Sequence, residues 1–183
     1  NKEEKSFLAF PLRVQIPATD GQTAPVVVDV SKEAAGEDAA GYRSGSRVEV
    51  VGTMYFKRRG DKLYFNLFAD EIRTAAADAT DKIEGELSFR GKVGQNIEEK
   101  RDRKEQPYTM FSAFSAEKVE DGFEYQWVRF FCFGKEREAW LQPGVRVEAR
   151  GGMTLSAHNG KVNVSCRAEE LAQHVADLSN SNE

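Results

Sequence analysis

A short run of rings and one arginine is the part of this sequence best suited to bind a flat ligand. The run is "WVRFFCF", residues 127–133. If it forms a strand, successive side chains point to opposite faces. One face then carries Trp127, Arg129, Phe131 and Phe133. The other face carries Val128, Phe130 and Cys132, and because it is wholly apolar we expect it to line a core.

The outward set matches what single-stranded nucleic acid requires. Every base offers a π-face for stacking on a ring, and every linkage offers a phosphate to a cation. The alternative is that these rings pack under a loop or at a subunit contact. For Phe131, a position in the core or at its rim is as good an interpretation as DNA contact.

A second candidate interleaves cations with rings in a hairpin-like stretch. "FKRRGDK", residues 56–62, carries a net charge of +3. The candidate binding residues here are Tyr55, Lys57, Arg58, Arg59, Lys62 and Tyr64. Rings for bases and cations for phosphates suit a single strand. An ordinary solvated hairpin tip is an equally good interpretation.

A third stretch, "QNIEEKRDRKEQP" at residues 95–107, balances four cations against four anions. It is predicted to be a mobile, solvated loop between two strands. Four of its residues could still clamp phosphates by becoming ordered on binding: Lys100, Arg101, Arg103 and Lys104. A loop without a binding role is the alternative.

Composition limits the function classes that remain. The chain has 183 residues, 31% of them charged, with a net charge of −4, so nucleic-acid binding would depend on local clusters. No apolar run approaches the ~20 residues of a membrane helix. The two cysteines lie in strand-like segments and are interpreted as buried thiols in a reducing cytosol. No metal, cofactor, small-molecule substrate or catalytic motif is expected, so an enzyme is not predicted.

An internal repeat indicates how these residues are positioned. "GSRVEVVGTM" at residues 45–54 recurs as "GVRVEARGGM" at residues 144–153, with six of ten positions identical. A glycine turn and an alternating strand follow each copy. Two copies at this spacing indicate a duplicated domain rather than a solenoid of short repeats. The repeated Arg47 and Arg146 could each form a structural ion pair or contact a phosphate.

Each copy is predicted to hold five strands with a helix between the third and fourth, which is the order of an OB-fold barrel. In the second copy the strands are predicted at 83–94, 107–118, 126–134, 145–155 and 161–171, with the helix at 135–144. In the first copy they are predicted at 7–16, 24–31, 47–56 and 62–72, with the helical piece at 32–45 and a less clear early strand. Trp140 is expected to plug the second barrel.

The sequence therefore predicts an all-β protein with short helices, built as two tandem OB-fold five-stranded barrels. The predicted domains are residues 1–76 and 82–172, followed by a polar tail at 173–183. Residues 74–82 are small and polar and are predicted to join the two domains.

The second copy resembles the bacterial single-stranded DNA-binding protein (SSB) family. The resemblance covers about half of the chain and is carried by "GKVGQN" (91–96), "FSAFSAE" (111–117), "WVRFFCFGK" (127–135), "AWLQPGVRVEARGGM" (139–153) and the last strand. The first copy has "PVVVDVSK" (25–32) in place of the Trp strand. Members of this family commonly recruit partners through an acidic run ending in Pro-Phe; the tail here has none, so either that role is unsupported or the chain has been truncated.

The resemblance implies single-stranded DNA as the partner, with bases stacked on Trp127 and Phe133. It also implies a cytoplasmic, nucleoid-associated protein of DNA replication, recombination, repair or conjugation. Two such barrels per subunit would resemble SSBs that dimerise to reach four OB-folds. Two alternatives stay open: a non-catalytic OB-fold assembly module, and an RNA-binding OB protein, because stacking does not distinguish the sugars.

Overall fold

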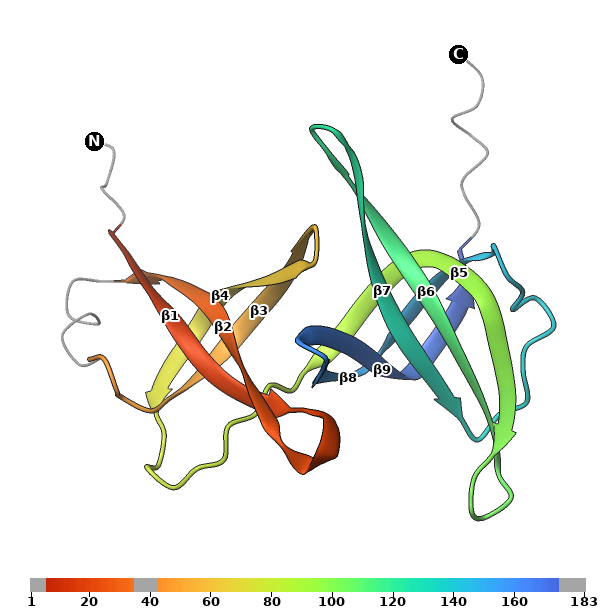
Figure 1. Cartoon of the computed structure of the whole chain (residues 1–183), viewed down its shortest axis with the longest axis horizontal. Helices are drawn as coiled ribbons and strands as arrows, with labels where there is room; N and C mark the ends of the chain where they lie inside the picture. Colours follow the sequence, from red (N-terminus) through yellow and green to blue (C-terminus); the bar gives the residue numbers. More distant parts are fainter. Residues whose placement is uncertain (1–5, 35–42, 175–183) are drawn as a thin grey trace. The chain divides into compact units, whose positions relative to one another are not determined.

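The computed structural model describes residues 6–34 and 43–174. The chain divides into two compact units, Asn1–Lys82 and Ile83–Glu183 (Figure 1). Strands make up nearly all of the regular structure, and within the described ranges there is no α-helix, only a 3-10 turn at Thr19–Gly21. None of the described segments forms a helix long and apolar enough to cross a membrane. Residues 175–183 of the predicted tail lie outside the described residues.

The second unit is a closed five-stranded barrel. Its strands are β5 (Glu86–Arg101), β6 (Pro107–Val119), β7 (Gly122–Phe133), β8 (Arg146–His158) and β9 (Lys161–Gln173). They follow the order β5-β6-β7-β9-β8. β5 closes the barrel because its first half pairs with β8 and its second half with β6. The five-stranded barrel predicted for this half of the chain is therefore present.

The barrel interior is filled by the side chains that alternation assigned to it. Val128 and Phe130 of β7 are 3% and 0% exposed. The Phe130 ring lies between Phe89 of β5 and Phe111 of β6, with centroids 5.0 and 5.2 Å away. Burying each such ring stabilises the fold by about 1.5–3 kcal/mol. The face of β7 opposite these residues is therefore free to meet a ligand.

The predicted helix at 135–144 does not form, and this expectation was wrong. The segment is an irregular loop in which Leu141 N donates to Glu138 O at 3.0 Å. Arg137 also caps this turn by donating from Nε to the Leu141 carbonyl at 2.9 Å. A helix this short is unstable without tertiary support, and Pro143 would end it. Trp140 was expected to plug the barrel, and this was also wrong. Leu141 is the buried residue of this segment, while Trp140 stays partly exposed.

The charged stretch at 95–107 is mostly strand, so the prediction of a mobile loop was wrong as well. Residues 95–101 belong to β5, and the ladder runs from Ile97↔Phe111 to Arg101↔Pro107. Only residues 102–106 form the turn. Its geometry is fixed by Asp102, whose carboxylate accepts from the amides of Lys104 and Gln106 at 2.8 and 2.9 Å. Such side-chain-to-backbone bonds are what make Asp favourable in turns.

The first unit is a four-stranded sheet, not the predicted five-stranded barrel. Its strands are β1 (Ser6–Pro17), β2 (Thr23–Ala34), β3 (Val48–Arg59) and β4 (Lys62–Thr74), in the order β1-β2-β4-β3. This is the order of β6-β7-β9-β8 in the second unit. β1 pairs with β2 along its whole length and so takes the place of β6. Among the described residues, no strand takes the place of β5.

The structure describes only residues 32–34 and 43–45 of the helical piece predicted at 32–45. Residues 32–34 belong to β2, and 35–42 lie outside the described residues.

The repeated glycines have one structural cause in both units. Gly52 and Gly151 each lie at a register shift between antiparallel strands. A Cβ at Gly52 would collide with the Phe68 carbonyl, and one at Gly151 with the Arg167 carbonyl. Only glycine permits this close approach of two backbones.

The segment between the units is anchored to the first of them. Arg47 forms an ion pair with Asp81 and donates to the Ala79 carbonyl at 2.6 Å. The Gln15 amide also donates to Asp81, at 2.9 Å. The Gln15 amide and then the Arg47 guanidinium lower the pKa of the Asp81 carboxyl. Arg47 thus forms the structural ion pair that was one of its two predicted roles.

Candidate nucleic-acid interface

One face of β7 carries a continuous row of rings. The outward residues of this strand, which we call the aromatic row, are Phe123, Tyr125, Trp127, Arg129, Phe131 and Phe133. The last four were predicted to share this face, and the burial of Val128 and Phe130 opposite them confirms the alternation. Phe123 and Tyr125 were missed because the strand was predicted to begin at Gln126, whereas β7 begins at Gly122. At the rise of a strand the row spans about 33 Å.

The Trp127 ring is held in place by two neighbouring strands, through Phe114 of β6 and Gly94 of β5. It lies 4.9 Å from the Phe114 ring of β6, at an interplanar angle of 51°. A Cβ at Gly94 of β5 would come within 2.9 Å of the indole, so the absence of a side chain there makes room for it. The side chain nevertheless remains 50% exposed. A ring fixed in this way loses little conformational entropy when a base stacks on it.

The far end of the row is a stack of several side chains. Phe133 lies 5.2 Å from Tyr108 and 6.1 Å from Phe131, with interplanar angles of 30° and 9°. The Arg167 guanidinium lies 4.7 Å from the Phe133 ring centroid. Tyr108 and Arg167 come from β6 and β9 through cross-strand pairing, so sequence spacing alone did not reveal them. Phe133 is partly covered by these neighbours, which leaves Trp127 as the better-placed stacking surface.

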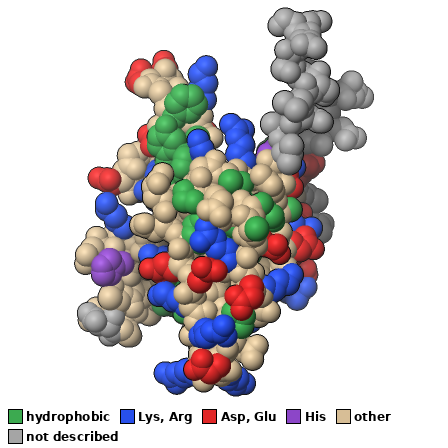
Figure 2. Space-filling view, turned by 90° about the vertical axis from the view of Figure 1, so that its right-hand side faces the viewer, with side chains coloured by type: hydrophobic (Ala, Val, Ile, Leu, Met, Phe, Trp, Pro, Cys, Tyr) green, Lys and Arg blue, Asp and Glu red, His purple; other side chains and the backbone are tan. Residues whose placement is uncertain are grey.

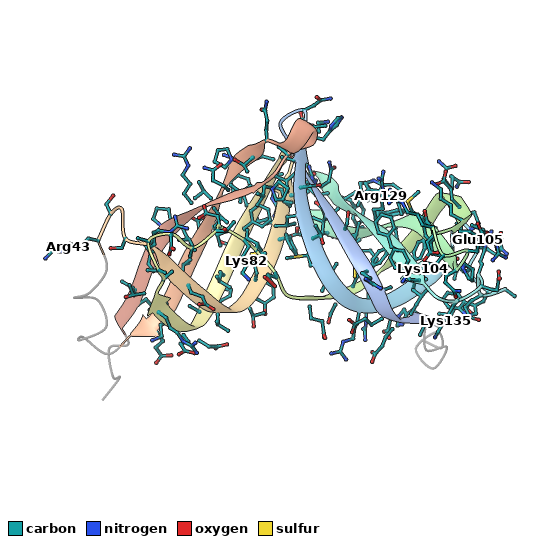
Figure 3. All side chains as sticks on the ribbon, turned by 90° about the horizontal axis from the view of Figure 1, so that it is seen from below. Arg43, Lys82, Lys104, Glu105, Arg129 and Lys135 are labelled. Atoms are coloured by element: carbon teal, nitrogen blue, oxygen red, sulfur yellow. The ribbon has the colours of Figure 1, made fainter. Side chains whose placement is uncertain are left out.

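Arg129 is the one cation within the row. It lies opposite Ser112 of β6 and Ser165 of β9, so its direct cross-strand neighbours are uncharged. Its side chain is exposed, and no ion pair among the described residues involves it. Figure 3 shows it on the second unit, away from the labelled residues of the turn after β5. The arrangement leaves the guanidinium able to pair with a phosphate.

The cations predicted at residues 95–107 lie at one end of the barrel. Lys100 and Arg101 belong to β5, while Arg103 and Lys104 belong to the turn that follows. Lys100 pairs with Glu98 at 3.4 Å, and Arg101 pairs with Glu136 at 3.7 Å. Such exposed pairs contribute only about 0–1 kcal/mol. These two ion pairs therefore hold the side chains of Lys100 and Arg101 only weakly.

The ring and cation set of the first unit has fewer rings than the aromatic row and lies on β3 and β4. Tyr55, Lys57 and Arg59 are alternate residues of β3, and Lys62 and Tyr64 follow on β4. Arg58 alternates to the opposite face. Lys62 Nζ lies 4.9 Å from the Tyr64 ring centroid, and the Tyr55 ring packs edge-on against Phe68 at 5.6 Å.

The strand of the first unit that corresponds to β7 has no ring row. This strand is β2, which pairs antiparallel with β1 and parallel with β4. Its outward residues include Val27, Asp29 and Glu33. The two units therefore differ in the chemistry of their equivalent faces.

The chain as a whole does not provide a basic field. Figure 2 shows hydrophobic side chains interspersed with both cationic and acidic ones on the face that it presents. With a net charge of −4, any attraction to phosphates must come from local groups such as Arg129.

The thiols take no part in this surface. Cys166 is buried in the core and Cys132 is partly buried, and both are free. Burial raises the pKa of each thiol to about 11, so both stay protonated at neutral pH. Within the described part of the chain, no three His, Cys, Asp or Glu side chains gather as metal ligands would.

Comparisons with known proteins give only distant structural similarities. No protein-family model matches the chain, and no curated protein matches it either. Similar solved structures include the single-stranded DNA-binding protein from Thermus aquaticus, at 12% identity and a TM-score of 0.44, covering 93% of this chain and 82% of that one.

Two shorter proteins are also similar. The small single-stranded DNA-binding protein from Streptomyces coelicolor has 10% identity and a TM-score of 0.42, covering 50% of this chain and 94% of that one. The PriB protein from Ralstonia solanacearum has 13% identity and a TM-score of 0.38, covering 49% and 97%. Because each TM-score lies below 0.5, the OB-fold assignment rests on the strand order and closure of the barrel itself.

Proposed function

We propose that this chain binds single-stranded DNA, largely without sequence preference, along the aromatic row of its second unit. The observation that carries the proposal is the row itself: five rings and an arginine on one exposed face of a rigid strand. Base stacking on such rings is sequence-tolerant, because every base has a π-face. Arg129 supplies a phosphate contact between the rings.

The exposure of the row supports an interface over a structural role. Phe123, Tyr125 and Trp127 are each about half exposed, although together they form a contiguous apolar strip. Monomeric proteins rarely leave large apolar patches in water unless something binds there. Duplex DNA does not suit the row, because its bases are already stacked inside the helix and cannot reach the rings.

For the first unit, the surface of β2 favours the alternative function, a non-catalytic assembly module. The outer face of β2 lacks rings, and its Asp29 and Glu33 would repel phosphates. We therefore expect the first unit to act mainly as a non-catalytic assembly module, with Tyr55, Tyr64 and their cations as a secondary contact. Pairing of two chains stays a prediction that light scattering checks.

The test is a titration with dT oligonucleotides of several lengths, following tryptophan fluorescence in a Trp140→Phe background so that Trp127 reports alone. We expect quenching that saturates. The binding constant should fall with salt at a slope of about −0.7 per phosphate contacted. Absence of quenching and of salt-dependent binding at low ionic strength would contradict the proposal. Unlabelled duplex should not compete, and RNA competing as well as DNA would favour the RNA alternative.

A further inference from the structure

A charged pocket lies at the end of the aromatic row. Three segments form it: the end of β5, the start of β6 and the loop after β7. It is an open depression with a volume of about 320 Å³. The residues that matter for its chemistry are Lys100, Arg101, Tyr108, Thr109, Lys135 and Arg137.

The charge of this pocket is opposite to that of the chain. Four cationic side chains line it against two carboxylates, Glu99 and Glu136, whereas the chain as a whole carries −4. Lys135 forms no ion pair with any described residue, and the Arg101–Glu136 pair is loose at 3.7 Å. The pocket therefore holds an excess of positive charge that its own residues do not neutralise. An anion is the ligand that this chemistry fits.

The loop that carries Lys135 is held in a fixed geometry. Arg137 is held by its bonds to the Leu141 carbonyl, at 2.9 Å from Nε and 2.8 Å from the terminal nitrogen. That fixes the loop carrying Lys135. Thr109 also lines the pocket and is only 2% exposed. Lys135 on this fixed loop is exposed, and a charge-assisted hydrogen bond from its ammonium to a phosphate oxygen would be a strong one.

The pocket lies where the aromatic row ends, so it would meet a phosphate at that end of a bound strand. Tyr108, on its wall, packs against Phe133, the last ring of the aromatic row. Immediately after Phe133 the chain turns at Gly134, which has a φ of 76° and donates its amide to the Pro107 carbonyl at 3.0 Å. The row ends here, and Figure 3 shows Lys135 and Lys104 at this end of the barrel. A strand that follows the row therefore arrives at the pocket.

We propose that the pocket binds a terminal phosphate of the single strand, so that the protein prefers strand ends that carry one. The inference rests on the proposed function and deepens it. A phosphate monoester carries about two negative charges near neutral pH, against one for an internal linkage. It therefore gains more from the net positive charge of the pocket lining than an internal phosphate does. The 5′ and 3′ phosphates share this chemistry, and the direction of the strand on the row decides which one enters.

The test compares three dT oligonucleotides of equal length by isothermal titration calorimetry: one without a terminal phosphate, one with a 5′ phosphate and one with a 3′ phosphate. We expect one phosphorylated strand to bind about tenfold tighter than the unphosphorylated strand, the size of one charge-assisted hydrogen bond. Lys135→Ala should abolish this ratio. Lys161→Ala, at the first residue of β9, is the control and should keep it.

The outcomes separate the two proposals. Equal affinity for all three strands would overturn the terminal-phosphate site while leaving strand binding intact. Failure of all three to bind would overturn the proposed function itself. Because Lys135 is exposed and makes no described ion pair, its replacement should leave the melting temperature unchanged. Retention of the phosphate preference in Lys135→Ala would also contradict the assignment.

Discussion

Replacing Trp127 by Ala removes the ring that lies near the middle of the aromatic row and is held against Phe114 and Gly94. One base loses its stacking partner. Stacking is worth about 1–3 kcal/mol per base, so the dissociation constant for a dT oligonucleotide should rise by about 5- to 150-fold. Trp127→Phe keeps a smaller ring in the same place and should fall between Ala and the parent protein.

Replacing Trp127 by Ala should also lower the free energy of unfolding, and the buried part of the side chain sets the size of this loss. The Trp127 side chain is 50% exposed, so about half of its surface packs on the barrel. Losing roughly 100 Å² of that contact costs about 2.5 kcal/mol of the free energy of unfolding, as an upper value. A change in binding must therefore be separated from a change in fold.

Val128→Ala is the matched control. Val128 is the next residue of the same strand but points into the barrel, where it is 3% exposed. Truncating it should cost about 2 kcal/mol of stability, similar to Trp127→Ala, without touching the outer face. Binding is measured by fluorescence anisotropy of a labelled dT oligonucleotide, and stability by urea denaturation. If both variants weaken binding equally, the effect arises from the fold, and the stacking argument is refuted.

Three other changes test separate parts of the account. Arg129→Ala should make the slope of log binding constant against log salt concentration shallower by about 0.7, and an unchanged slope would show that it contacts no phosphate. Gly151→Ala should lower the melting temperature strongly, because the new Cβ would collide with the Arg167 carbonyl. Gly152→Ala has open space around its Cβ and should leave the melting temperature nearly unchanged. Equal changes in melting temperature for the two variants would contradict the bulge geometry. Burial raises the pKa of Cys132 and Cys166 from 9.0 to about 11, so the folded state binds more protons between these values and the free energy of unfolding should fall as pH rises from 9 to 11. Urea denaturation across this range should show a smaller fall when both thiols are replaced by Ala.

The sequence predicted the strands well because their determinants are local. Period-two alternation and glycine turns placed all nine strands to within a few residues, apart from the extended β5 and the early start of β7. The alternation also correctly placed Trp127 on the outer face of the strand and Val128 on the inner face. The recurrence of Gly52 as Gly151 revealed the duplication, and the structure supplies its reason in the two close backbone approaches.

What the sequence did not predict depends on tertiary pairing. The Glu, Lys and Arg of residues 95–101 suggested a solvated loop, but β5 extends through them because β6 pairs with it from Ile97 to Arg101. The segment around Trp140 suggested a helix, but it is too short to fold alone and the Arg137 bonds hold it as a loop. Arg167 joins the row only because β9 lies parallel beside β7.

The central claim is that the single strand lies on the outer face of β7. Ultraviolet cross-linking of the whole chain to a dT oligonucleotide, with the attached peptides mapped by mass spectrometry, tests it most directly, because rings stacked on thymine are the groups placed to react. The account predicts cross-links at Trp127 and its neighbours in the aromatic row, suppressed by excess unlabelled single strand but not by duplex. Cross-links confined to the first unit, or none at saturating oligonucleotide, would contradict it.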